Sequence, residues 1–175
     1  MPTDPRYPIG KYEPQPFSEN LRNEWLNDIK YLPQLLESVV EDLDEAQLQT
    51  PYREGGWTVH ELVHHIADSH INALCRFKLA LTEERPTIKP YEESEWVKLD
   101  DVKHLPINIS ITLLHALHAR WYEAVRNLSM EQLNRSVIHP ESKKEMTVWF
   151  LLGMYSWHGR HHVAHITTLK DEKGW

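Results

Sequence analysis

The segment from residue 147 to residue 170, TVWFLLGMYSWHGRHHVAHITTLK, constrains the fold more than any other part of the chain. Residues that recur at spacings of three and four fall on one face of a helix. Here that face is mostly apolar and consists of Val148, Leu151, Tyr155, His158, His162, Ile166 and Leu169. Thr147 is a suitable N-cap, and Lys170 places a cation where it suits a helix C-terminus. The segment therefore predicts a helix of about six turns that buries one side.

Two histidines interrupt the apolar residues of this face. His158 and His162 lie one helical turn apart, a spacing at which two imidazoles can bind one cation. A histidine on an apolar face is more often a core residue than a ligand, and the pair strengthens the case for a ligand. His161 and His165 repeat the same spacing on a neighbouring face that is less apolar at its C-terminal end. Periodicity favours His158 and His162 over this rival pair.

Three other long segments have the pattern of amphipathic helices. They run from residue 18 to about 40, from 58 to about 81, and from 108 to 127, and Pro33 is expected to kink or interrupt the first. Thr58 and Glu61 form a capping box at the start of the second. Together with residues 147–170, these segments predict an all-α protein, a four-helix bundle with one domain over residues 1–175.

The remaining parts of the chain read as an arm and connections. Residues 1–16 contain five of the eleven prolines, which predicts an extended arm. Residues 84–106 form a long irregular connection with a short helix. Ser129 and Gln132 indicate a capping box on another short helix, and residues 137–146 suit a loop or a small extended excursion.

A metal site on this bundle needs a third ligand from another helix, because catalytic zinc usually has three protein ligands and an open position. The second helix offers His60, His64, His65 and His70. His65 is the best placed, between the apolar face and a polar strip made of Glu61, Asp68, Ser69, Asn72 and Arg76. Spacing alone leaves all four histidines open.

Charge and cysteine content limit the partners and the compartment. The net charge is −7 and no basic block occurs, which argues against nucleic acid as a partner. The single Cys75 excludes an intramolecular disulfide and fits a reducing compartment. Neither a signal-peptide pattern nor a run of about 18 apolar residues is present, so we expect no membrane segment and a cytoplasmic location.

Two motifs resemble the signatures of the DinB/YfiT superfamily: GGWTVHELVHHIADSH at residues 55–70 and YSWHGRHHVAHI at residues 155–166. RFKLALTEERPTIKPYEESEW, LHARW and the terminal GW are similar to its YfiT branch, so the resemblance covers nearly the whole chain. It implies a four-helix bundle, commonly a homodimer, with one divalent metal ion per chain held by three histidines. Those positions correspond to His65, His158 and His162. Zinc is the leading identity, and nickel also suits imidazole ligands.

The resemblance implies a metal-dependent hydrolase that activates water to attack a small-molecule substrate. The runner-up is a metal-dependent thiol S-transferase of the bacillithiol type, because the helix lacks the glutamate of an H-E-x-x-H motif that would serve as a general base. A non-catalytic metal-binding protein is the third interpretation. Asp68 and Glu61 are candidates to orient a ligand imidazole; the alternatives are that Glu61 serves only its capping box and that Asp68 is only solvated. No catalytic residue is assigned. Many superfamily members continue the last ligand as H-R-G-Q, whereas this chain has His162-Val-Ala-His165.

Overall fold

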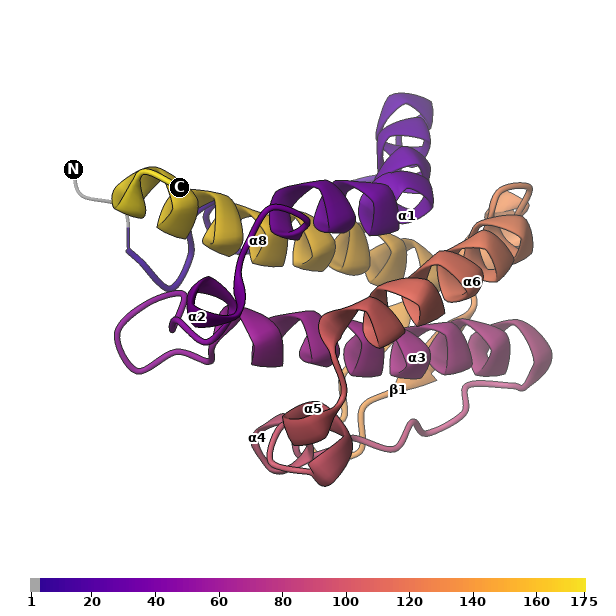
Figure 1. Cartoon of the computed structure of the whole chain (residues 1–175). Helices are drawn as coiled ribbons and strands as arrows, with labels where there is room; N and C mark the ends of the chain where they lie inside the picture. Colours follow the sequence, from indigo (N-terminus) through magenta and orange to yellow (C-terminus); the bar gives the residue numbers. More distant parts are fainter. Residues whose placement is uncertain (1–3) are drawn as a thin grey trace.

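Four long helices form the body of the protein in a computed structural model that describes residues 4–175 (Figure 1). They are α1 (Glu19–Val40), α3 (Val59–Thr82), α6 (Ile107–Val125) and α8 (Val148–Lys173). The connections hold four short helices and one antiparallel hairpin: α2 (Glu45–Leu48), α4 (Glu93–Trp96), α5 (Asp100–His104), α7 (Met130–Leu133), β1 (Ser136–Ile138) and β2 (Glu145–Thr147). The predicted all-α four-helix bundle is confirmed. None of the helices described has a stretch that is both long and apolar enough to cross a membrane.

The helices are not arranged in the order of a simple up-and-down bundle. α1 packs against α6 and α8, and α3 packs against the same two helices. Helices α1 and α3 therefore lie at opposite corners of the bundle, and so do α6 and α8. The connections between diagonal partners must cross an end of the bundle, which explains why α2 fits between α1 and α3 and why α7 and the hairpin fit between α6 and α8.

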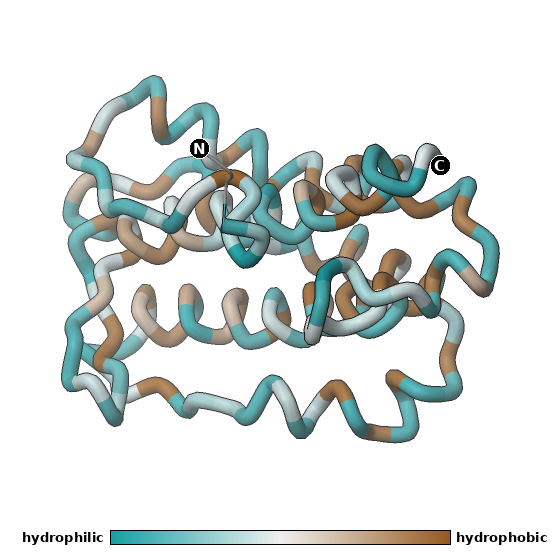
Figure 2. Tube along the Cα trace, turned by 90° about the vertical axis from the view of Figure 1, so that its left-hand side faces the viewer, coloured by the Kyte–Doolittle hydropathy of each residue, from teal (hydrophilic) through white to brown (hydrophobic). Residues whose placement is uncertain are grey.

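Polar side chains cap the starts of α1, α3 and α8, whereas α6 begins after Pro106 without a side-chain cap. Thr58 caps α3, accepting a hydrogen bond from the Glu61 amide, while the Glu61 side chain accepts one from the Thr58 amide, which confirms the predicted capping box. Thr147 caps α8 in the same position that the sequence indicated. Pro33 lies inside α1, which stays a continuous helix and changes direction along its course (Figure 1). Hydrophobic and hydrophilic residues alternate as bands along the helices (Figure 2).

The core consists of two apolar clusters at opposite ends of the bundle. One includes Trp25, Phe77 and Trp121, and the other includes Leu62 and Ile166. On α3, α6 and α8, histidines stand between the residues of one cluster and those of the other: His70, His118 and His158. The centre of the bundle is thus a polar layer between two apolar ones.

The N-terminal arm lies along α8 of its own chain. The Trp157 indole donates to the carbonyl oxygen of Gly10 over 3.0 Å, and the Trp149 indole donates to that of Gln15 over 2.8 Å. The Tyr12 hydroxyl donates to the Phe150 carbonyl oxygen. The predicted arm spans residues 1–16; residues 4–16 form neither helix nor strand and turn at residues 5–6 and 8–9, and residues 1–3 lie outside the described part.

Candidate metal centre

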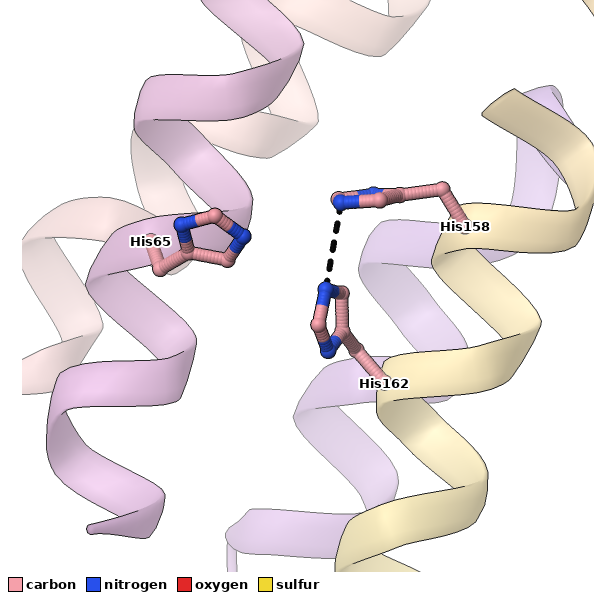
Figure 3. A group of neighbouring side chains, drawn as sticks. All are labelled: His65, His158 and His162. Carbon is pink, nitrogen blue, oxygen red and sulfur yellow. Dashed lines mark hydrogen bonds between the residues drawn. The ribbon is translucent and has the colours of Figure 1, made fainter. Parts of the chain in front are cut away.

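Three histidines from two helices converge on one point inside the bundle. His65 projects from α3, and His158 and His162 project from α8 (Figure 3). One ring nitrogen from each lies within 4.8 Å of the other two. The Nε2 atoms of His158 and His162 are 3.1 Å apart, and the His65 ring centroid is 5.1 Å from that of His162 and 5.7 Å from that of His158.

Burial makes these imidazoles neutral. It lowers the pKa of His65 to about 4, and it lowers the pKa of His158 and of His162 well below the usual range, with repulsion among neighbouring imidazoles as a further cause. Neutral imidazole is the form that binds a metal ion. Two nitrogens bound to one zinc ion at tetrahedral geometry are about 3.4 Å apart. The three side chains therefore suit a divalent ion with one position left open.

The other three histidines of α3 are engaged elsewhere. His60 Nε2 lies 2.7 Å from the carbonyl oxygen of Val102, and His64 Nε2 lies 3.1 Å from that of Leu105. Both contacts hold the segment that contains α5 against α3. His70 lies behind His158, at 3.1 Å from its Nδ1. Of the four α3 candidates, only His65 joins the α8 pair.

The rival pair on α8 is also buried, which periodicity alone did not indicate. The Nε2 atoms of His161 and His165 are 3.2 Å apart, His161 stacks on Trp157, and His165 packs against Tyr52. The loop of Tyr52 and the N-terminal arm cover this side of α8 in addition to its core-facing side. Within residues 4–175, no further histidine, cysteine or carboxylate joins the pair to make a group of three.

The polar strip of α3 lies partly under the connection that contains α4 and α5. Burial, together with repulsion from Asp101, raises the pKa of Asp68 to about 6. Arg76 donates to the Tyr155 hydroxyl over 2.8 Å, and the Tyr155 ring centroid is 6.0 Å from that of His158. A charged guanidinium is therefore held close enough to His158 to act on it electrostatically.

The partner that orients a ligand imidazole differs from the one expected. The Glu61 carboxylate is occupied by its capping box, and in the described part of the chain neither it nor Asp68 hydrogen-bonds to His65, His158 or His162. The side chain that hydrogen-bonds to His158 at Nδ1, the nitrogen that faces away from the other two imidazoles, is His70. His70 in turn contacts His118 of α6, whose Nε2 lies 2.8 Å from His70 Nδ1, and a histidine among the apolar positions of that helix is the signal in the sequence that could have indicated these contacts.

Comparison with known proteins agrees with this architecture. Residues 28–166 match the model of the DinB superfamily. A Bacillus cereus protein named "Putative metal-dependent hydrolase" is 47% identical over 173 residues, covering 98% of this chain and 99% of the relative, and a Bacillus anthracis protein with the same name is equally similar. The solved structure of YfiT from Bacillus subtilis, described as a probable metal-dependent hydrolase with an unusual four-helix bundle topology, superposes with a TM-score of 0.95. It is 45% identical, with 98% of each chain covered.

Proposed function

Because this chain belongs to the DinB superfamily and is similar over nearly its whole length to relatives named as metal-dependent hydrolases, we propose that it is a metal-dependent hydrolase whose ion is held by His65, His158 and His162. The observation that carries the proposal is the convergence of three neutral imidazoles from α3 and α8. We propose one ion per chain, with zinc as the leading identity and nickel as the alternative.

A divalent ion at this site supplies Lewis acidity that lowers the pKa of a coordinated water toward neutrality or polarises a substrate oxygen. The chain contributes the three lone pairs and keeps them deprotonated through burial. Arg76, beside Tyr155, supplies a positive charge that attracts a substrate carrying negative charge or a carbonyl dipole. Such a substrate is a small molecule.

Metal content tests the ligand assignment directly. We expect elemental analysis of the metal-loaded protein to give about one ion per chain, and His158→Ala to lose it. His161→Ala is the matched control, because it removes a buried imidazole of the same helix that is not one of the three converging rings. Full metal content in His158→Ala, with loss in His161→Ala, would overturn the assignment, and several ions per chain would favour a storage or sensing role.

Thiol transfer is the second candidate function. The observation that favours it is that Gly159 follows His158, so the helix lacks the glutamate that serves as the general base in an H-E-x-x-H motif. A thiol bound as thiolate needs no such base at neutral pH. Turnover of chromogenic esters and of an electrophilic alkyl halide, each with and without added low-molecular-weight thiol, separates the two. Ester turnover without thiol supports the hydrolase, and turnover only with thiol supports the transferase.

A further inference from the structure

Three imidazoles, of which His70 and His118 are fully buried and His158 is partly buried, form a hydrogen-bonded chain that crosses the whole bundle. His158 Nδ1 lies 3.1 Å from His70 Nε2, and His70 Nδ1 lies 2.8 Å from His118 Nε2. His118 Nδ1 lies 2.5 Å from the carbonyl oxygen of Ile29. Each of the four long helices contributes one member: α8, α3, α6 and α1 in that order. His70 is 0% exposed and His118 is 1% exposed, so water does not complete these contacts.

The carbonyl group at the end of this chain sets the direction of every hydrogen bond in it. A backbone carbonyl only accepts, so His118 Nδ1 carries the proton. His70 and His118 are fully buried, and within the described residues their ring nitrogens contact only other imidazoles and a backbone carbonyl, with no carboxylate to balance a positive charge, so both rings are neutral and each has one N–H. His118 Nε2 is then an acceptor, and His70 must donate to it from Nδ1. His70 Nε2 becomes the next acceptor, and His158 must donate to it from Nδ1.

We propose that His70 and His118 are positioning residues that hold His158 in its Nδ1–H tautomer, so that its Nε2 lone pair is free to bind the metal ion. The role of this tautomer in metal binding rests on the proposed function, whereas the tautomer itself follows from the hydrogen-bond contacts. Metal-bound histidines usually donate their second N–H to a carboxylate, carbonyl or water. Here His158 donates to His70, His70 donates to His118, and His118 donates to the backbone carbonyl oxygen of Ile29 on α1.

His162 differs from His158 in this respect. Its Nδ1 is buried without a hydrogen-bond partner in the described structure, and its Nε2 is 3.1 Å from the Nε2 of His158. Because His158 Nε2 holds a lone pair, His162 must donate to it from Nε2 when no metal is present. His158 Nε2 therefore already carries a lone pair and no proton, whereas the proton of His162 must move from Nε2 to Nδ1 before its Nε2 can bind the ion.

Imidazole nitrogen chemical shifts of the metal-free protein test the tautomers without any variant. Long-range ¹H–¹⁵N spectra distinguish the two neutral forms, and we expect His158 as Nδ1–H and His162 as Nε2–H. An Nε2–H tautomer at His158 in the wild-type protein would overturn the proposal. If the wild-type protein bound no metal, the proposed function would fail, while this spectrum would still decide whether His70 and His118 hold His158 in its Nδ1–H tautomer.

Variants of His118 test whether the hydrogen-bonded chain of His118, His70 and His158 affects metal binding. His118→Leu removes both the donor and the acceptor, and we expect a mixed His158 tautomer and about 10-fold to 100-fold weaker zinc binding in competition with a chromogenic chelator. His118→Gln retains one donor and one acceptor, and we expect it to recover part of the affinity. Trp121→Phe is the packing control, because Trp121 lies 5.3 Å from the His118 ring and its indole nitrogen is buried without a partner. Unchanged tautomer and affinity in folded His118→Leu, or an equal loss of affinity in Trp121→Phe, would overturn the proposal.

Discussion

At the scale of single residues, Asp68 makes the stability of the metal-free protein depend on pH. Burial raises its folded-state pKa to about 6, above the ordinary value of 3.8. The folded state therefore binds the proton more tightly, and the free energy of unfolding falls as pH rises through the window between these values. Asp68→Asn cannot ionise, so its stability relative to the parent should increase from pH 5 to pH 7.5. Urea denaturation at the two pH values measures this, with the exposed Asp171→Asn as control. A pH-independent difference for Asp68→Asn would contradict the expectation.

Some features of the candidate site could be predicted from the sequence, and others could not. Helical spacing brought His158 and His162 to one face, and the family resemblance selected His65 among the α3 histidines. Spacing could not show that His161 and His165 are buried as well, because their cover comes from Tyr52 and the arm, far away in the sequence. It also could not show the contact between His70 and His158, which depends on how α3 and α8 are placed relative to one another.

At the scale of elements, the close approach of α1 to α8 depends on glycine in α8. A Cβ atom at Gly153 would lie 2.6 Å from both the Trp25 ring and the Tyr12 hydroxyl. Trp25 is 4% exposed and packed against Trp149, so it has no room to move. Alanine gains about 1 kcal/mol of helix propensity over glycine, but overpacking costs about 1–3 kcal/mol.

We therefore expect Gly153→Ala to lower the free energy of unfolding despite the better helix former. Gly159→Ala is the matched variant, because its Cβ would meet Leu32, whose flexible side-chain end can shift. We expect Gly159→Ala to lower the free energy of unfolding less than Gly153→Ala does. Guanidinium denaturation of both variants and the parent gives the comparison, and a Gly153→Ala variant as stable as the parent would show that overpacking at this contact costs no more than the gain in helix propensity.

The boundaries of elements were predictable where a local side chain determines them. Thr58 with Glu61, Ser129 with Gln132, and Thr147 cap helices at the positions expected from sequence, because capping involves residues only three apart. The hairpin of β1 and β2 was not distinguished from a loop. Its strands have three residues each, and β1 is supported by pairing of Ile138 with Thr87, a contact that local sequence does not encode.

At the scale of the whole molecule, the metal site is expected to be dispensable for folding. Two apolar clusters flank the polar layer, and a chain of this length buries enough surface to fold without a metal staple. Circular dichroism of the chelated protein should therefore retain the helical signal and unfold cooperatively. The melting temperature should still fall modestly, because an ion that binds only the folded state stabilises it by mass action. Loss of the helical signal at room temperature would indicate a structural metal site. The homodimer and the cytoplasmic location stay predictions.

The diagonal placement of consecutive helices has a consequence for how fast the chain can fold. In an up-and-down bundle each helix docks on the one just made, so contacts are local and folding is fast. Here, among the described helices, α1 packs mainly against α6 and α8, and the apolar cluster that contains Trp25 and Val148 closes when segments more than a hundred positions apart have met. The entropy of closing those loops is lost before most of the packing energy is gained. This protein should therefore fold more slowly than its helix content alone would imply, at a rate nearer to that of mixed α/β domains.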